Sequence, residues 1–174
     1  MTIKLHPLYR GSIIQLNLET VTLPNGKAID LEIVHHPGGV AVLAEDAEGR
    51  LCLIRQYRHA AGGWLWEIPA GKLEPGEAPE LTAQRELLEE AGVEAGRWQK
   101  LGHTVTSPGI LTEVIHLYFA TDLNHKTHAH EDAELIEIHW FPLEQIEAMV
   151  QQGMIVDAKT LVGLYLFKQA ALRD

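Results

Sequence analysis

The stretch GKLEPGEAPELTAQRELLEEAGV, residues 71–93, decides the fold, because it has the pattern of a tight loop that leads into an acidic helix. Pro75 and Gly76 are typical turn residues, since proline presets φ and glycine accepts positive φ. Pro79 suits the first turn of a helix, where a missing N–H is harmless. Gly92 suits a left-handed C-cap. The sequence therefore predicts a helix that begins near residue 79 and ends before residue 92.

The predicted helix has an apolar face and an acidic face. Apolar residues recur at helical spacing along one side: Leu81, Ala83, Leu87, Leu88 and Ala91. At about 100° per residue, Glu86, Glu89 and Glu90 fall within an arc of roughly 100° on the other side. Carboxylates this close repel one another weakly on a helix surface. We therefore expect a cation beside them, with an ordinary solvated acidic face as the alternative.

The spacing of these residues resembles the Nudix box. Gly71 and Glu77 are followed by Arg85-Glu86-Leu87, by Glu89-Glu90 and by Gly92-Val93, which matches every defined position of that pattern. The Nudix family hydrolyses nucleoside diphosphates linked to another moiety and uses Mg²⁺ or Mn²⁺. The resemblance implies an α/β fold, a Nudix α/β/α sandwich with a mixed sheet, and the activity of a pyrophosphohydrolase.

Composition and charge are those of a globular protein. The chain has 174 residues, of which 46% are hydrophobic and 22% charged, as expected for one domain with a small appendage. A formal net charge of −10 argues against nonspecific nucleic-acid or anionic-membrane partners. No segment approaches the roughly 18 apolar residues of a membrane span, and the first residues contain no apolar leader. We expect a cytoplasmic protein, in which the single Cys52 is a buried apolar residue.

Alternation and turn signals predict the other elements. Residues 1–38 contain two alternating stretches around Pro24-Asn25-Gly26-Lys27, which predicts an N-terminal β-hairpin unit with a loose lead-in. Residues 39–174 are expected to form the Nudix domain. Strands are expected at 40–43, 51–54, 64–68, 99–105, 114–120 and 135–140, and two more helices at 142–152 and 158–172, the last with Asp157 as N-cap. This order suits a mixed sheet between helices.

The resemblance assigns the acidic helix face to metal binding. It implies that Glu86 and Glu90 are the principal ligands, that Glu89 reaches the same ions or orients a water, and that the backbone carbonyl of Ala70 is a further ligand. Mg²⁺ prefers oxygen ligands and keeps several waters, so a few carboxylates and substrate phosphates suffice. Gly71 would let the backbone approach these groups closely.

Two arginines each have two interpretations. Arg85 could hold Glu89 or Glu77 as a structural residue, or it could contact substrate. Arg58 could clamp a phosphate, because a guanidinium offers bidentate donors, or it could form an ordinary salt bridge at the end of a strand. The sequence leaves both alternatives open.

Features outside the box resemble the ADP-ribose pyrophosphatase and nucleoside diphosphate sugar hydrolase branch of the family. Pro108 lies fifteen residues after Val93, as in that branch, and the runs 55–58 and 67–71 are similar to it. The N-terminal hairpin is similar too, and in that branch it is exchanged between the subunits of a homodimer. The resemblance therefore implies a homodimer in which residues 1–38 are exchanged.

The same resemblance nominates substrate-binding residues. Glu113 and the backbone of 107–109 would contact the terminal ribose, and Glu32 would contact the base across the dimer. Leu31 stands where the branch often has an arginine, which leaves a preference for adenine open. The candidate substrate-binding residues are Glu32, Arg58, Lys72, Ser107, Pro108, Gly109 and Glu113.

A second acidic group lies in the stretch 128–134. Counting back from the predicted strand that contains Ile136, Glu134 matches a metal-binding glutamate of the branch. Asp132 falls where the family usually carries its catalytic-base glutamate, but its side chain is one methylene shorter, so Glu131 is an alternative base. A solvated acidic turn is the other interpretation. The candidate catalytic residues are Asp132, Glu134 and Glu89, and the candidate metal ligands are Ala70, Glu86, Glu89, Glu90 and Glu134.

Together these features predict a homodimeric hydrolase that converts ADP-ribose to AMP and ribose 5-phosphate with Mg²⁺, or with Mn²⁺. Hydrolysis of GDP-mannose or another nucleoside diphosphate sugar is the alternative within the same class. A module that senses nucleotide sugars without turnover is a third possibility, although such modules usually lack the box glutamates. Trp64 and Trp66 could stack a nucleobase, or they could belong to the core or to a dimer interface.

Overall fold

The computed structural model describes residues 3–126 and 135–172. They form two compact units, one containing residues 1–38 with 105–114, and the other containing 39–104 with 115–174. None of the helices in these described ranges has the length and apolar run needed to cross a membrane.

The first unit is built on a three-stranded antiparallel sheet with the order β1-β2-β3: β1 (Ile3–Arg10), β2 (Gln15–Thr22) and β3 (Ala28–His35). The hairpin predicted from sequence is the β2–β3 pair. The lead-in expected to be loose is instead strand β1, which pairs along β2 with a register shift between Pro7 and Tyr9. Pro7 cannot donate to a ladder, but it is tolerated because β1 is an edge strand.

The loop between residues 105 and 114 belongs to this first unit. Leu111 forms a parallel bridge with Val34 of β3. The Val34 N–H donates to the Ile110 carbonyl at 2.7 Å, and the Thr112 N–H donates back to the Val34 carbonyl at 3.0 Å. The loop therefore continues the N-terminal sheet, although it lies more than 70 residues further along the chain.

The second unit contains a mixed sheet system between helices. Its strands are β4 (Gly39–Ala44), β5 (Arg50–Arg58), β6 (Gly63–Glu67), β7 (Ala70–Lys72), β8 (Val93–Val105), β9 (Val114–His125) and β10 (Ile136–Pro142). Their orders are β7-β4-β9-β8 and β10-β5-β6. Strand β4 runs parallel to β9 and antiparallel to β7. The mixed α/β architecture predicted from sequence is confirmed.

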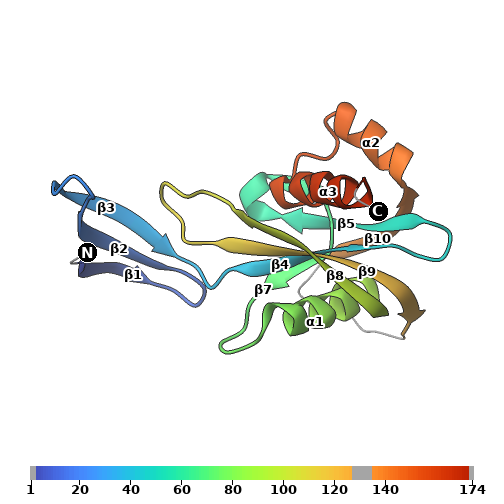
Figure 1. The fold of residues 1–174 in the computed structure, drawn as a ribbon, viewed down its shortest axis with the longest axis horizontal. Coiled ribbons are helices and arrows are strands. Elements are labelled where there is room, and N and C mark those ends of the chain that lie inside the picture. The colour runs from blue at the N-terminus through green and yellow to red at the C-terminus, as the bar shows by residue number, and fades with distance from the viewer. Residues whose placement is uncertain (1–2, 127–134, 173–174) are drawn as a thin grey trace. The chain divides into compact units, whose positions relative to one another are not determined.

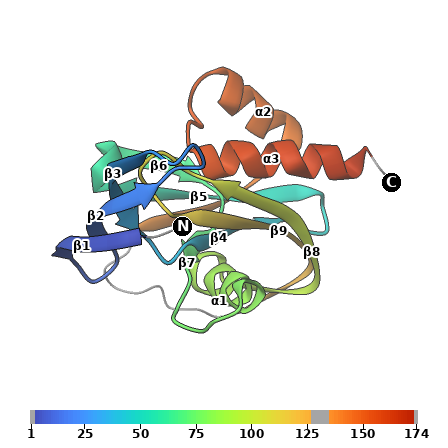
Figure 2. The ribbon, with the colours of Figure 1, turned by 60° about the vertical axis from the view of Figure 1, so that its left-hand side comes forward.

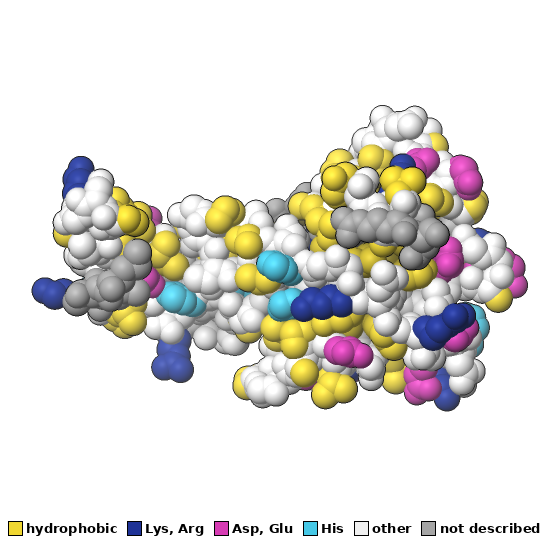
Figure 3. Space-filling view, in the orientation of Figure 1, with side chains coloured by type: hydrophobic (Ala, Val, Ile, Leu, Met, Phe, Trp, Pro, Cys, Tyr) yellow, Lys and Arg dark blue, Asp and Glu magenta, His cyan; other side chains and the backbone are white. Residues whose placement is uncertain are grey.

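Among the described residues of this unit, the helices are α1 (Pro79–Ala91), α2 (Leu143–Gln151) and α3 (Ala158–Ala171), and a short 3₁₀ turn, η1 (His59–Ala61), follows β5. Figures 1 and 2 show α1 on one side of the strands and α2 with α3 on the other. A groove of about 530 Å³ lies between α2 and α3. Figure 3 shows hydrophobic side chains gathered at the surface over these two helices.

Strand β4 lies at the centre of the core, and every one of its residues is buried. Ala41 and Leu43 pack in the cluster beneath α2 and α3, whereas Val40 and Val42 pack in the cluster beneath α1. A strand covered on both faces is expected to be continuously apolar. Cys52 belongs to the α1 side, and burial raises the pKa of its thiol, which makes it a poor nucleophile.

The helix ends follow the sequence signals. Helix α1 begins at Pro79 and ends before Gly92, which adopts a left-handed conformation with φ of 66°. Helix α3 begins after Asp157, whose side chain accepts a hydrogen bond from the Thr160 N–H. Both boundaries agree with the predicted helices, because proline and capping residues act locally.

Candidate active site

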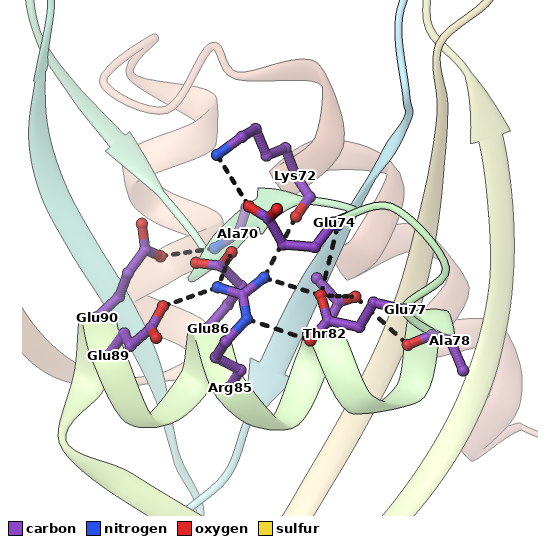
Figure 4. A network of polar contacts seen from close by, with 10 residues as sticks. All are labelled: Ala70, Lys72, Glu74, Glu77, Ala78, Thr82, Arg85, Glu86, Glu89 and Glu90. Carbon is purple, nitrogen blue, oxygen red and sulfur yellow. Dashed lines mark hydrogen bonds and ion pairs between the residues drawn. The ribbon is translucent and has the colours of Figure 1, made fainter. Parts of the chain in front are cut away.

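The acidic face of α1 lies against strand β7. Figure 4 shows Glu86, Glu89 and Glu90 projecting from the helix toward this strand. The Ala70 N–H donates to Oε2 of Glu90 at 2.7 Å. Glu90 is only 3% exposed, so its carboxylate is held in a fixed position beside the β7 backbone.

Gly71 is required by the close approach of Glu86. A Cβ placed on Gly71 would lie 1.9 Å from the carboxyl carbon of Glu86, far closer than any real contact. The close backbone approach expected at this glycine is therefore present, and a carboxylate occupies the space that a side chain would fill. Glu86 and Glu90 consequently flank the backbone at residues 70 and 71.

Arg85 bridges the loop and the acidic face. Its Nη1 donates to Glu86 at 2.7 Å and to Glu89 at 2.8 Å. Its Nε and Nη2 donate to the two carboxylate oxygens of Glu77 at 3.2 and 3.1 Å. Arg85 therefore holds three carboxylates in this structure, which is the arrangement expected of a structural residue.

The hydrogen bonds between Arg85 and Glu77 shift the pKa values of both groups. Hydrogen bonds from Arg85 and from the Thr82 hydroxyl lower the pKa of Glu77 to about 2. The same bond to Glu77, followed by the charge of Glu86, raises the pKa of Arg85. Glu77 thus stays ionised and anchors the loop before α1 to the first two turns of the helix.

The donor atoms on this face suit a hard cation. Glu86, Glu89 and Glu90 offer carboxylate oxygens and Ala70 offers a carbonyl, and oxygen ligands are those preferred by Mg²⁺. Among the described residues, no three His, Cys, Asp or Glu side chains are already spaced as a metal cluster. Figure 4 shows the guanidinium of Arg85 in contact with both Glu86 and Glu89. The residues fit such an ion, provided that Arg85 yields or shares these oxygens.

Arg58 forms a bidentate salt bridge with Glu67. Its Nε and Nη2 each donate to a different carboxylate oxygen at 2.9 Å. Glu67 is 1% exposed, and Lys159 of α3 also contacts it. Burial alone would raise the pKa of Glu67, but the hydrogen bonds from Arg58 and the charge of Lys159 outweigh it and lower the pKa. This is the strand-end salt bridge named above as one of two alternatives for Arg58.

Comparison with known proteins identifies the family. The NUDIX domain model matches residues 35–161. This chain belongs to the Nudix family. The solved structure of an ADP compounds hydrolase has the same fold, with a TM-score of 0.82, 22% identity and coverage of 97% of this chain and 92% of that one. The Nudix fold predicted from sequence is therefore confirmed.

Relatives of this Nudix chain carry several names. It is 42% identical to ADP-ribose pyrophosphatase of Bacillus subtilis (strain 168), over 99% of this chain and 95% of that protein. It is 39% identical to methanol dehydrogenase activator of Bacillus methanolicus, again over 99% and 95%. It is 34% identical to GDP-mannose pyrophosphatase of Cronobacter sakazakii (strain ATCC BAA-894), over 82% and 80%.

The candidate residues of the Nudix chain divide between its two units. Ala70, Lys72 and the acidic face of α1 lie in the second unit, where Lys72 pairs with Glu74 at 3.4 Å. The residues expected to bind ribose and base lie in the first unit: Glu32, Ser107, Pro108, Gly109 and Glu113. There, Glu113 pairs with His36 at 3.2 Å. Asp132, Glu134 and the alternative Glu131 lie outside the described residues.

The two tryptophans have different surroundings. Trp66 packs against the core cluster beneath α2 and α3, whereas Trp64 is 41% exposed. The guanidinium of Arg55 lies over both rings, 5.2 Å from the centre of Trp64 and 5.9 Å from that of Trp66. These contacts give Trp66 a structural role.

Three residues of the α3 N-terminus are close to the site and were not among the candidates. Lys159 contacts Glu67, and the Thr160 hydroxyl accepts a hydrogen bond from the N–H of the next residue, Ile68. Asp157, which was expected only as the N-cap of α3, accepts from the Thr160 N–H. The first two of these contacts join residues 92 positions apart. No local signal in the sequence could have indicated them, because each depends on how α3 packs on the sheet.

Proposed function

We propose that this Nudix chain hydrolyses the diphosphate of nucleoside diphosphate sugars, with ADP-ribose converted to AMP and ribose 5-phosphate. The carrying observation is the placement of Glu90 and Glu86 beside the β7 backbone, Glu90 at Ala70 and Glu86 at Gly71. A relative at 42% identity is named ADP-ribose pyrophosphatase and is matched over nearly its whole length, which supports the substrate class.

Residues of α1 and β7 would hold the divalent ions of this reaction. Ala70, Glu86, Glu89, Glu90 and Glu134 are the proposed ligands of Mg²⁺ or Mn²⁺. Bound divalent ions would neutralise phosphate oxygens and lower the pKa of a water. Asp132, Glu134 or Glu89 would accept the proton of the attacking water, whose oxygen ends on one phosphate product.

The proposed substrate contacts are those that the resemblance to the nucleoside diphosphate sugar hydrolases implies. Arg58 and Lys72 would meet the diphosphate, and residues 107–109 with Glu113 would contact the terminal ribose. Glu32 would reach the base from the partner in a homodimer with exchanged N-terminal regions. A cytoplasmic location completes the proposal.

A substrate panel tests the proposed reaction. The wild-type chain is incubated with ADP-ribose, GDP-mannose and other nucleoside diphosphate sugars, with Mg²⁺ or Mn²⁺ and with EDTA as control. Products are identified by mass in water enriched in ¹⁸O. We expect AMP and ribose 5-phosphate, one ¹⁸O atom in one of them, and no turnover with EDTA. Absence of turnover on every compound would exclude the hydrolase proposal.

GDP-mannose is the second candidate substrate. Leu31 replaces an arginine that the ADP-ribose branch often carries beside the base contact, and a relative at 34% identity is named GDP-mannose pyrophosphatase. The ratio of kcat/KM for ADP-ribose and GDP-mannose decides between them. A sensing role without turnover is disfavoured, because Glu86, Glu89 and Glu90 are all present.

A further inference from the structure

The four residues that precede Gly71 are tied to the first turn of α3. Glu67 ends β6, and its carboxylate contacts Lys159. The next residue, Ile68, donates its N–H to the Thr160 hydroxyl at 3.0 Å. Side chain and backbone of this segment are therefore held by neighbouring residues of one helix.

The tie is itself anchored at the start of the helix. Asp157 accepts from the N–H and the hydroxyl of Thr160 at 2.9 and 2.6 Å, and it pairs with Lys159 at 3.1 Å. Thr160 is fully buried and the Lys159 side chain is 16% exposed. One N-cap carboxylate thus orients both groups that reach the 67–70 segment.

The other end of the segment is fixed by strand β4 and by helix α1. The Pro69 carbonyl accepts from the Val42 N–H at 2.8 Å, and the Ala70 N–H donates to Glu90 of α1 at 2.7 Å. The peptide that carries the Ala70 carbonyl therefore lies between two helices, α1 and α3. A shift of the α3 contacts would be passed along three residues to that carbonyl.

We infer that Lys159 and Thr160 are positioning residues for the metal site, because they hold the 67–70 segment so that the backbone at Ala70 and Gly71 stays beside Glu90 and Glu86. The inference rests on the proposed function of that site. Neither residue has to touch substrate, since each acts through the backbone. If Lys159 is lost, Arg58 still pairs with Glu67 and Thr160 still accepts from the Ile68 N–H. We therefore expect Lys159→Met to fold while losing one of the two ties to α3.

Metal binding without substrate gives the direct test. Mn²⁺ affinity is measured by electron paramagnetic resonance for wild type, Lys159→Met, Lys159→Arg and Lys168→Met. Lys168 is the matched control, because it also forms an ion pair from α3, with the exposed Glu147. Loss of a residue that supports a metal ligand typically lowers metal affinity or activity by 10–100-fold. We therefore expect about tenfold weaker Mn²⁺ binding in Lys159→Met. Lys159→Arg should restore most of it, and Lys168→Met should match wild type.

Kinetics and a second pair of variants complete the test. We expect Lys159→Met to lower kcat more than it changes KM. If Lys159→Met unfolds, Thr160→Val, which loses the hydroxyl, is compared with Thr160→Ser, which keeps it. Equal Mn²⁺ affinity in Lys159→Met and Lys168→Met, or in the two Thr160 variants, would overturn the positioning role. A wild-type chain that binds no Mn²⁺ and turns over no nucleotide sugar would instead refute the proposed function.

Discussion

Glu90 combines deep burial with a direct bond to the backbone of the proposed metal site. We expect Glu90→Gln to fold normally, because an amide oxygen can still accept from the Ala70 N–H. The same variant should lower metal-dependent turnover by at least about 100-fold, because the loss of a residue that only supports a metal ligand already lowers metal affinity or activity by 10–100-fold. Steady-state kinetics and circular dichroism check both statements. Glu80→Gln, the same change at an exposed position of the same helix, should leave turnover unchanged, and full activity in Glu90→Gln would make the metal assignment wrong.

Gly71 tests the close packing of the carboxylate against the backbone. In Gly71→Ala the new Cβ would lie 1.9 Å from the Glu86 carboxyl carbon, so either the strand or Glu86 must move. Because the atoms met are the far end of a flexible side chain, Glu86 can turn away at little cost in stability. We therefore expect weaker Mn²⁺ binding with little change in urea denaturation. Gly63→Ala is the control, because its Cβ meets nothing within 4 Å. Wild-type metal affinity in Gly71→Ala would show that Glu86 can bind from another position.

At the scale of elements, the loop before α1 depends on an ionised Glu77. Its pKa is about 2 in the folded chain, against an ordinary value of 4.5. Because folding lowers this pKa, the ionised Glu77 side chain stabilises the fold at pH values above 4.5. This stabilisation is lost as the pH falls from 4.5 toward 2. We expect the free energy of unfolding of wild type to fall more steeply across that range than that of Glu77→Gln. Urea denaturation at several pH values measures the difference, and equal slopes would contradict it.

The sequence predicted those elements whose signals are local. Pro79 and Gly92 gave both ends of α1, and Asp157 gave the start of α3. Strand β1 was missed, because Pro7 and the mixed polarity around it are unfavourable for a strand. It forms because β2 offers a free edge, and such pairing depends on a neighbour rather than on the strand itself.

At the scale of the whole molecule, the sequence suggested the local bonds from Arg85 to Glu77 and Glu89, but not the contacts from distant parts of the chain. The ties from Lys159 and Thr160 join residues 92 positions apart. The loop at 105–114 joins the N-terminal sheet through Val34. Packing creates these contacts, and no pattern along the chain encodes them. Arg58 is an example, because the sequence contains both Arg58 and Glu67 but does not indicate that they form a bidentate salt bridge.

The proposed exchange of N-terminal regions makes a prediction about mixed dimers. In a dimer with exchanged N-terminal regions, each shared site would take Glu32 from one subunit and Glu90 from the other. We expect Glu32→Ala and Glu90→Gln homodimers to be weakly active, each with both sites damaged. A hybrid would concentrate both changes in one site and leave the other intact. Because half of the dimers in an equal mixture are hybrids, activity should recover to about a quarter of wild type.

The hybrids are made by co-expressing the two variants with different tags and purifying over both. Analytical ultracentrifugation should first show a dimer of the 19.4 kDa chain. Purification separates the hybrid from the two parent dimers, so that its own activity can be measured. We expect about half of wild-type activity, because one of its two sites is intact. Activity no higher than the mean of the parents would place Glu32 and Glu90 in the same subunit's site. A monomer at working concentration would remove the shared site altogether, because no partner could then supply Glu32.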